Sequence, residues 1–297
     1  SSILHNGGNL NFVDISKKDI NIDLDKIKKL KYKVNTIIPI HFSGSAVELK
    51  NFRSSYPKIK IIEDSAHALG AKYKTGDMVG SCKYSDLSVF SLHPAKTITS
   101  GEGGIITTNN REYYERLKLL SNNGVQKDKK NFKIKKYSKD LWYYEVQDLG
   151  FHYRITDFQC ALAISQLNKI NEFLKKRKNL VKIYDDEFKN FNNLNPAIDY
   201  LERKNSSNHL YVVRIQYKQI KKTRNTVMKL LKKKGIVTQV HYIPIVNHPF
   251  FKNFVNKNTK FENTKSYYDE ALSIPLYYSL KETQQAKIIN ELKKIVG

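Results

Sequence analysis

Short apolar runs alternate with segments of helical periodicity through the first half of the chain. The apolar runs predict strands at 37–41, 59–63, 86–91 and 104–108. The periodic segments predict helices at 46–55 and 112–122. Strands that alternate with helices are typical of a wound sheet, so this half of the chain predicts an α/β architecture.

The second half is predicted to begin with the longest helix of the chain. Thr156 and Gln159 form a Thr-x-x-Gln capping box, and an apolar stripe from Phe158 to Leu174 follows helical spacing. We expect most of this stripe to be core. From about residue 180 a smaller α/β domain is predicted, with strands at 210–216 and 236–241 and helices at 223–234 and 282–296. The expected domains are therefore 1–180 and 181–297.

The segment between these halves, 124–149, is polar, aromatic and without periodicity. We predict a long irregular loop there, and long loops in compact domains are usually functional or disordered.

Two charged residues follow predicted strands. Asp64 comes directly after the strand at 59–63, and Lys96 follows the strand at 86–91. Ligands of open α/β sheets bind at the carboxyl ends of strands. A Lys and an Asp at such ends suggest a pyridoxal phosphate site, in which the amine binds the aldehyde and the carboxylate keeps the pyridine nitrogen protonated. Taken singly, each residue is equally explained as a surface charge or a helix cap.

Several blocks of sequence carry a family resemblance. In chain order they are Glu63-Asp64-Ser65-Ala66-His67-Ala68-Leu69-Gly70, Phe90-Ser91-Leu92-His93-Pro94-Ala95-Lys96 with Gly101-Glu102-Gly103-Gly104, and the segments 150–159 and 235–244. The chain thereby resembles the DegT/StrS family of pyridoxal phosphate-dependent nucleotide-sugar aminotransferases, and 271–277 resembles the closing strand of that family. The resemblance implies an aspartate aminotransferase-like large domain (fold type I) with a wound mixed sheet, plus a smaller C-terminal α/β domain.

The resemblance also implies roles for particular residues. Lys96 is the catalytic residue, which holds the cofactor and acts as general base once displaced from it. Asp64, His67 and Ser91 are expected to bind the cofactor, through the pyridine nitrogen, the ring and the phosphate in that order. His152 stands where the family usually has Asn, whose side chain reaches the cofactor phosphate of the neighbouring subunit. A homodimer with shared sites is therefore expected.

Four further residues are weaker candidates for contact with the substrate or a phosphate, namely His41, Arg154, His241 and Tyr242.

Two segments, 142–150 and 239–244, are similar to those of transaminases of pseudaminic acid biosynthesis, which make sugars for surface glycans. These enzymes move an amino group from glutamate to C4 of a UDP-linked 4-keto-6-deoxy-N-acetylhexosamine. An aminotransferase for another keto-sugar nucleotide is the alternative within the family. Related sugar dehydratases carry His in place of Lys96, which argues against that activity. A non-catalytic binding or regulatory protein, possibly one that binds DNA, is the alternative from another class.

The segment 9–15 resembles a strand that lies well inside the large domain of the family. We therefore expect this domain to be N-terminally incomplete and to lack the Gly-Thr turn that helps to hold the cofactor phosphate, a loss that can make the chain as it stands inactive.

The composition adds a strongly basic balance. The chain has 52 Lys and Arg against 28 Asp and Glu, a net charge of +24 with neutral His. Lysine accompanies abundant Asn, Ile and Tyr, and runs such as 26–31 and 232–234 fall on predicted helix faces or ends. We interpret the charge as solvated helix faces rather than as a nucleic-acid surface. A positive field also suits a nucleotide sugar.

Membrane, disulfide and metal chemistry find no support in the sequence. No apolar run approaches the ~20 residues that cross a bilayer, and no basic-then-apolar leader is present. Cys82 and Cys160 are far apart, and the eight His lack metal-ligand spacing. We expect a cytoplasmic enzyme without a metal.

Overall fold

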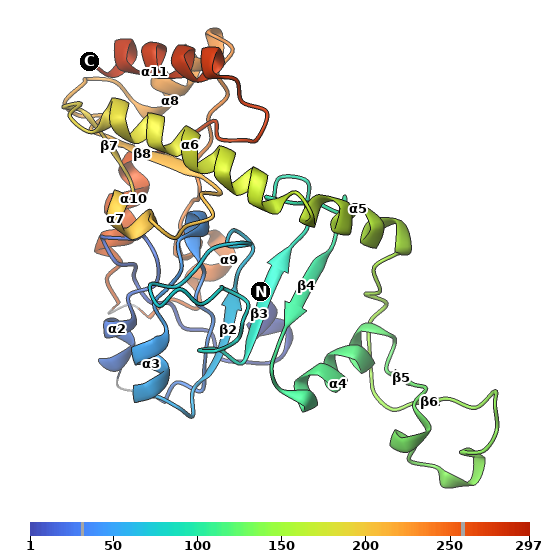
Figure 1. Ribbon diagram of the computed structural model, residues 1–297. Coiled ribbons are helices and arrows are strands. Elements are labelled where there is room, and N and C mark those ends of the chain that lie inside the picture. The colour runs from blue at the N-terminus through green and yellow to red at the C-terminus, as the bar shows by residue number, and fades with distance from the viewer. Residues whose placement is uncertain (31–32, 257–258) are drawn as a thin grey trace.

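A four-stranded mixed sheet carries the half of the chain that holds Asp64 and Lys96 (Figure 1). Its strands lie in the order β1 (Thr36–Ile37), β2 (Lys60–Asp64), β3 (Leu87–Ser91) and β4 (Gly104–Thr107). The first three are parallel and β4 is antiparallel to β3, so the predicted wound mixed sheet is confirmed. The structure is a computed structural model that describes residues 1–30, 33–256 and 259–297.

The predicted first strand, 37–41, is shorter than expected. Only Thr36–Ile37 pairs as a strand, and a single parallel bridge joins Ile40 to Asp64 further along. Pro39 lies between these two pairings, and because it has no backbone N–H it interrupts the ladder. The segment 9–15 forms no named strand; only Ile15 makes an isolated bridge, to Ile22.

The helices in this half of the chain lie mostly at its ends. Helices α1 (Ser2–His5) and α2 (Leu24–Lys28) precede β1, α3 (Lys50–Ser55) connects β1 to β2, and α4 (Arg111–Ser121) follows β4. The helix predicted at 46–55 therefore begins four residues late, whereas α4 agrees with its prediction within one residue at each end. The basic run predicted at 26–31 overlaps the last turn of α2, and its residue 31 lies outside the described residues.

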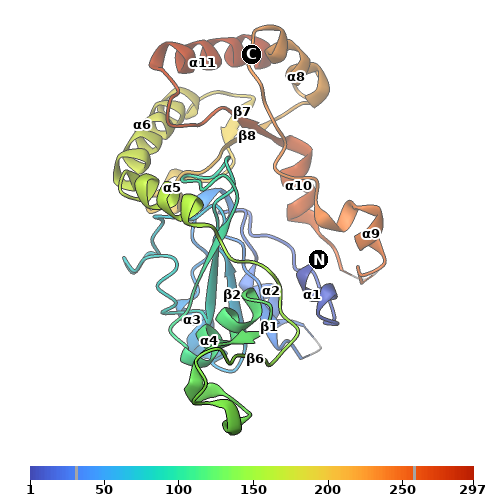
Figure 2. The same ribbon diagram turned by 90° about the vertical axis from the view of Figure 1, so that its right-hand side faces the viewer.

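A second, antiparallel sheet has the order β7 (Leu194–Pro196), β8 (Tyr211–Ile215) and β9 (Ala271–Ile274). Helices α6 (Ile170–Phe188), α8 (Arg224–Lys233) and α11 (Glu282–Val296) lie on one side of it (Figure 2). Along β8, Val213 packs against these helices, while Val212 packs with Ile20 from the first half of the chain. This sheet is thus packed on both faces.

The predicted strand at 236–241 is the exception in this half. It forms only a bridge between Gln239 and Ser273. The predictions at 210–216, 223–234 and 282–296 agree with β8, α8 and α11. The remaining helices here are α7 (Tyr200–Arg203), α9 (Pro249–Lys252) and α10 (Glu262–Glu270). Residue 180 lies inside α6, and the division into domains 1–180 and 181–297 stays a prediction.

The predicted long helix is two helices, α5 (Asp157–Leu167) and α6, with a break at 168–169. The Thr156–Gln159 capping box is present. The expectation that the apolar stripe is core is wrong for α5, where no residue is buried and Phe158 is 90% exposed. The reason is visible in Figure 1, where α5 lies at the margin of the molecule beyond β4.

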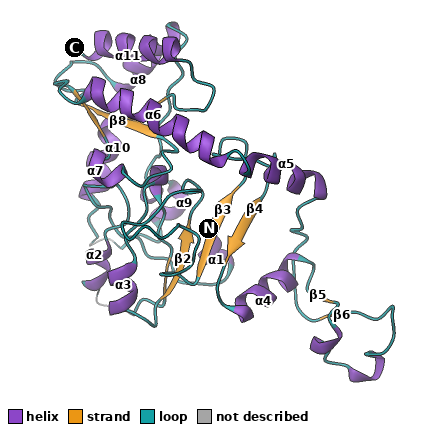
Figure 3. Ribbon diagram, viewed as in Figure 1, coloured by secondary structure: helices purple, strands orange, loops and turns teal. Residues whose placement is uncertain are grey.

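The predicted irregular loop at 124–149 extends away from the rest of the molecule (Figure 3). It contains a small hairpin of β5 (Val125–Gln126) and β6 (Glu145–Val146) and two short 3-10 helices, Lys129–Asn131 and Lys135–Tyr137. The carboxylate of Glu145 accepts the backbone N–H groups of Lys133 (2.8 Å) and Ile134 (2.7 Å), which closes the loop on itself.

Within the described residues, no helix is both long and apolar enough to cross a membrane.

Candidate active site

Asp64 and Ser91 lie on the same face of the large sheet. Along β2, Ile61 packs in the apolar core with Phe90 of β3, and Glu63 is buried on that side. Side chains alternate along a strand, so Asp64 and Ser91 point to the opposite face. Asp64 pairs with Val89 in the parallel register, which brings the carboxyl ends of β2 and β3 to one edge. This edge is where ligands of open α/β sheets bind.

The backbone of Asp64 is held firmly. Its N–H donates to the carbonyl of Pro39 (2.9 Å), and its carbonyl accepts from the N–H of His41 (3.0 Å). Its side-chain Oδ1 accepts the N–H of Ala66 (3.1 Å), so one carboxylate oxygen is fixed by the local turn.

Lys96 lies in the turn that follows β3. Its N–H donates to the carbonyl of His93 (2.9 Å), and the turn closes where Thr99 and Ser100 both donate to the carbonyl of Leu92. Gly103 ends this turn at a φ of 153°, where a Cβ would lie 2.7 Å from Ser100 Oγ, so the chain requires glycine there.

Burial lowers the pKa of the Lys96 amine, while the negative charge of Asp64 acts in the opposite direction and does not cancel the effect. A lowered pKa leaves more free amine at neutral pH, which suits both a nucleophile and a base.

Two histidines stack beside these charges. The ring of His67 lies 4.3 Å from the ring of His209, at 25° between their planes. Burial, followed by the charge of Lys96, lowers the pKa of His67 to about 3. Burial likewise places the pKa of His209 well below its usual value, with the charges of His67 and Arg177 as the next causes. Both rings are therefore uncharged, and Nδ1 of each has no hydrogen-bond partner in the described part of the chain.

His241 and Tyr242 reach the same region from the other half of the chain. His241 Nδ1 lies 2.7 Å from Ser273 Oγ, and burial followed by the charge of Lys96 lowers the pKa of His241. Burial, then the charge of Asp64, raises the pKa of Tyr242. Of the residues predicted from the sequence, the structure thus brings His67, His241 and Tyr242 within the electrostatic reach of Asp64 or Lys96.

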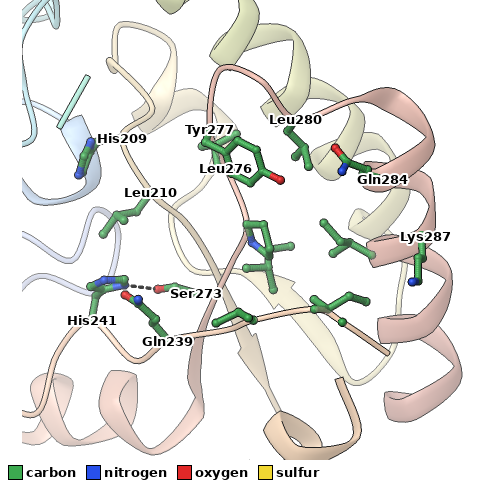
Figure 4. A pocket seen from close by; sticks show the side chains of 16 residues that line it. His209, Leu210, Gln239, His241, Ser273, Leu276, Tyr277, Leu280, Gln284 and Lys287 are labelled. Atoms are coloured by element: carbon green, nitrogen blue, oxygen red, sulfur yellow. Dashed lines mark hydrogen bonds between the residues drawn. The ribbon is translucent and has the colours of Figure 1, made fainter. Parts of the chain in front are cut away.

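Two cavities open at His241. One of about 450 Å³ has His209 and His241 at one side and Gln284 and Lys287 of α11 at the other (Figure 4). The second, of about 920 Å³, is mostly apolar and is lined by Tyr242 and Phe42 among others. Both cavities reach His241, whereas Asp64 and Lys96 line neither of them.

His41 does not belong to the site surface, which corrects its prediction as a substrate contact. The side chain is fully buried, Nε2 lies 2.5 Å from Glu63 Oε2, and Nδ1 accepts the N–H of Val47 (2.9 Å). Glu63 also accepts hydrogen bonds from Tyr73 and Ser85. Both ring nitrogens of His41 are thus occupied, and the residue anchors the strand that carries Asp64.

His41→Ala is expected to lower the free energy of unfolding by about 3–5 kcal/mol, because a buried carboxylate loses its partner. Urea denaturation measures this loss. Glu48→Ala, an exchange of a nearby carboxylate that accepts one backbone N–H from Lys74, is the control and should cost much less. A variant that unfolds like the parent but shows a raised KM would restore the substrate role.

His152 and Arg154 remain apart from this constellation. His152 and Arg154 are exposed and face each other, with Arg154 Nη2 3.1 Å from His152 Nε2. No interaction found among the described residues joins either of them to Asp64 or Lys96. Ser91 Oγ accepts the N–H of His93 (3.4 Å) and lies at the end of β3 on the site face.

His209 is the site residue that sequence reasoning missed. It precedes β8, more than a hundred residues from His67, and no local pattern distinguishes it from an ordinary residue before a strand. Only the packing of β8 and its flanking residues against the first half of the chain brings the two rings together.

These residues fit pyridoxal phosphate. Lys96 provides a half-buried amine of lowered pKa, Asp64 provides a carboxylate with one oxygen held in place, and His67 provides a neutral ring with an unpaired nitrogen. An amine for the aldehyde, a carboxylate for the pyridine nitrogen and a flat ring are the groups that this cofactor requires.

Comparison with known proteins agrees with this site. The sequence profile of the DegT/DnrJ/EryC1/StrS aminotransferase family matches residues 1–293. The chain is 34% identical over 291 residues to UDP-4-amino-4,6-dideoxy-N-acetyl-beta-L-altrosamine transaminase of Campylobacter jejuni, covering 96% of this chain and 72% of the relative. Helicobacter pylori PseC, an aminotransferase involved in the biosynthesis of pseudoaminic acid, superposes with a TM-score of 0.87 at 29% identity, covering 99% and 75%.

The pyridoxal phosphate form of the putative sugar aminotransferase Spr1654 from Streptococcus pneumoniae superposes with a TM-score of 0.84 at 26% identity, covering 99% of this chain and 76% of that one. The fold and site define a pyridoxal phosphate-dependent sugar aminotransferase. The chain belongs to the DegT/DnrJ/EryC1/StrS aminotransferase family, which sets aside the alternative of a non-catalytic binding protein.

Proposed function

We propose that this enzyme moves an amino group from glutamate to C4 of a UDP-linked 4-keto-6-deoxy-N-acetylhexosamine, in the biosynthesis of a sugar of the pseudaminic acid type. The observation that carries the amino transfer is the half-buried Lys96 amine in the field of the strand-end Asp64. Similarity to the Campylobacter jejuni transaminase and to PseC supports the choice of sugar. The cytoplasmic location and the lack of nucleic-acid binding stay predictions.

A second keto-sugar nucleotide is the rival within the same family. The chain is also 30% identical over 302 residues to the spore coat polysaccharide biosynthesis protein SpsC of Bacillus subtilis, covering 100% of this chain and 76% of that protein. The test is amino transfer itself. Release of 2-oxoglutarate from glutamate, measured with the UDP-linked 4-keto sugar as acceptor, supports the proposal, and release only with a different keto sugar supports the rival.

Pyridoxal phosphate supplies an electron sink for the carbon that gains or loses the amine. In our proposal Lys96 Nζ would hold the cofactor through its aldehyde and would act as the base that moves the proton at the reacting carbon. Its lowered pKa raises the fraction of free amine that can accept that proton. Asp64 would compensate the positive pyridine nitrogen, His67 would lie against the ring, and Ser91 would donate to the phosphate.

Covalent labelling tests the assignment of Lys96. Borohydride reduction of the protein with bound pyridoxal phosphate, followed by peptide mapping, is expected to place the label on Lys96 and on no other lysine, because this amine combines burial with a site carboxylate. Lys72, which lies beyond the same Asp64–Gly70 block, is the internal comparison. A label on Lys72 or elsewhere in place of Lys96 refutes the assignment.

We further propose a homodimer whose partner completes the site. Apolar side chains are exposed over one region of the chain, where single monomers rarely leave so many together, namely Leu149, Phe151, Tyr153, Phe158, Leu162 and Ile164. His152 and Arg154 lie within this region and contact each other rather than Lys96 of their own chain. In the proposed dimer these two side chains contact the cofactor phosphate of the partner subunit.

Hybrid dimers test the shared site. Lys96→Ala and His152→Ala are each expected to be nearly inactive, and an equimolar mixture after subunit exchange should recover about a quarter of parental activity, since half of the dimers then carry one intact site. A mixture of Lys96→Ala with Asp64→Asn is the control and should stay inactive, because both changes fall in the same site. Heterodimers that form without any recovery contradict the shared site.

A further inference from the structure

Two aromatic rings of this chain contact the ring of His67. His209 stacks on it at 4.3 Å, and Phe42 meets it edge-on at 6.1 Å and 60°. His209 is 6% exposed, so it cannot itself touch a ligand over any large area. In the proposed function His67 lies against the cofactor ring, which makes His209 the next ring behind it.

The segment before β8 is fastened to the backbone around His67. Ser207 Oγ donates to the carbonyl of His67 (2.6 Å), and the N–H of His209 donates to the carbonyl of Ser43 (2.9 Å). At Gly44 an added Cβ would lie 2.1 Å from Ser207 Oγ, so the two segments approach as closely as glycine permits. The stacking of the two imidazoles is therefore fixed by the main chain as well as by the rings.

A buried arginine holds the same segment from the other side. Arg177 of α6 is 6% exposed, and its Nη1 donates to the carbonyls of Asn208 (3.3 Å), His209 (3.1 Å) and Leu276 (3.1 Å). No carboxylate of the described chain forms an ion pair with it, and its Nε has no partner. A buried cation that holds only carbonyl groups is costly, so this arrangement is maintained against a penalty.

The burial of His209 also lowers the stability of the fold. Its buried Nδ1 lacks a hydrogen-bond partner, a loss of about 1–3 kcal/mol for a typical group of this kind. Among the described residues, the ring of His209 is found to contact one other ring, that of His67; their centroids are 4.3 Å apart, just below the range of about 4.5–7 Å that is usual for aromatic pairs.

We propose that His209 is a positioning residue of this aminotransferase, which supports the ring of His67 so that His67 can hold the cofactor ring in place. This inference rests on the proposed function. Arg177 contributes by fixing the carbonyl that follows the supporting ring. This role requires a flat ring at position 209 but does not require the nitrogens of imidazole.

The test compares cofactor affinity and turnover in variants at 209. His209→Ala is expected to bind pyridoxal phosphate about 3- to 10-fold more weakly, the range set by the worth of one aromatic stack, with kcat reduced and KM for the sugar little changed. His209→Phe, which keeps the stack without the unpaired nitrogen, should bind the cofactor within about twofold of the parent. His209→Leu, which fills the volume without a flat ring, should resemble the Ala variant and takes its place if that variant does not fold.

Two controls separate positioning from a general loss of stability. Val212→Ala removes a buried side chain three residues further on, which packs with Ile20 and Tyr267 rather than with His67. It should lower the melting temperature without changing cofactor affinity. In the background of His67→Ala, the change His209→Ala should add less than about twofold to the loss of affinity, because the ring that it supports is absent.

Three results overturn the inference: unchanged affinity in His209→Ala and His209→Leu, full additivity with His67→Ala, or an equal loss of affinity in Val212→Ala. Failure of the proposed function is distinguishable. If borohydride does not label Lys96 in the parent protein, the aminotransferase site itself is misassigned. If Lys96 is labelled and the variants at 209 bind the cofactor like the parent, only the role of His209 is wrong.

Discussion

Asp64→Asn is expected to lower kcat/KM for amino transfer by about 10²–10³, the usual loss when one fixed electrostatic partner of a transition state is removed. The amide cannot compensate a positive pyridine nitrogen. It can still accept the N–H of Ala66, because that bond uses a single side-chain oxygen. The free energy of unfolding should therefore change by about 1 kcal/mol or less. Steady-state kinetics and urea denaturation measure the two effects.

Asp23→Asn is the matched control for this change. Asp23 Oδ1 accepts the N–H of Asp25 at 3.1 Å, two residues on, just as Asp64 does with Ala66, but Asp23 caps α2 and does not interact with Lys96. It should leave kcat/KM unaltered. If Asp64→Asn turns over at the rate of Asp23→Asn, then Asp64 is only a cap of the local turn.

Asp64→Asn is also expected to change the pKa of the Lys96 amine. In the parent, the negative charge of Asp64 raises the pKa of the Lys96 amine while burial lowers it. Removing the charge leaves burial unopposed, so in the cofactor-free protein the pKa of Lys96 should fall further. Labelling of the amine by an acylating reagent should then begin at lower pH in Asp64→Asn than in the parent.

The kcat/KM for the UDP-linked 4-keto sugar is expected to exceed the kcat/KM for a 3-keto or a dTDP-linked analogue by several orders of magnitude. A site that hydrogen-bonds a substituent rejects an analogue without it by about 10⁴–10⁵, since its buried polar groups are left unpaired. Polar groups of this kind are available at His241, which lines both cavities, at Gln239 in the smaller cavity and at Tyr242 in the larger one.

Competition between the acceptors at equal concentration, with both aminated products quantified by mass spectrometry, measures this ratio directly. Gln239→Ala should reduce the preference, while Gln284→Ala, on α11 at the far side of the smaller cavity, is the comparison. Preference for the 3-keto or dTDP-linked sugar leaves the family assignment intact and refutes the sugar that we propose.

Local patterns predicted the parts of this structure that depend on local interactions. The strands that carry Asp64 and Ser91, the capping box of α5 and the bounds of α11 all follow from short-range apolar spacing and capping. Whether a side chain is covered depends on distant segments. Sequence reasoning therefore proposed His41 as a substrate contact and the face of α5 as core, whereas His41 is fully buried and no residue of α5 is buried.

Sequence reasoning missed His209 for the same reason. His209 becomes part of the site only because Ser207 and His209 attach to Ser43, Gly44 and His67, contacts that link segments far apart in the chain. That Asp64 and Lys96 lie close enough to interact was predictable, because both follow strands of one sheet and the family resemblance places them together; their roles stay a prediction. No comparable motif marked His209.

The neighbouring acids Glu63 and Asp64 cannot exchange places. Glu63 faces the core, where His41, Tyr73 and Ser85 surround its carboxylate, and Asp64 faces the site. The two positions differ in length as well as in direction: the longer side chain reaches across to His41, and the shorter one stays beside its own turn. The double change Glu63→Asp with Asp64→Glu would conserve composition and charge. The shorter Asp at 63 would no longer reach His41, Tyr73 and Ser85, and the longer Glu at 64 would extend further toward the proposed cofactor position. A comparison that scores Asp and Glu as near equivalents therefore misjudges both positions of this dipeptide.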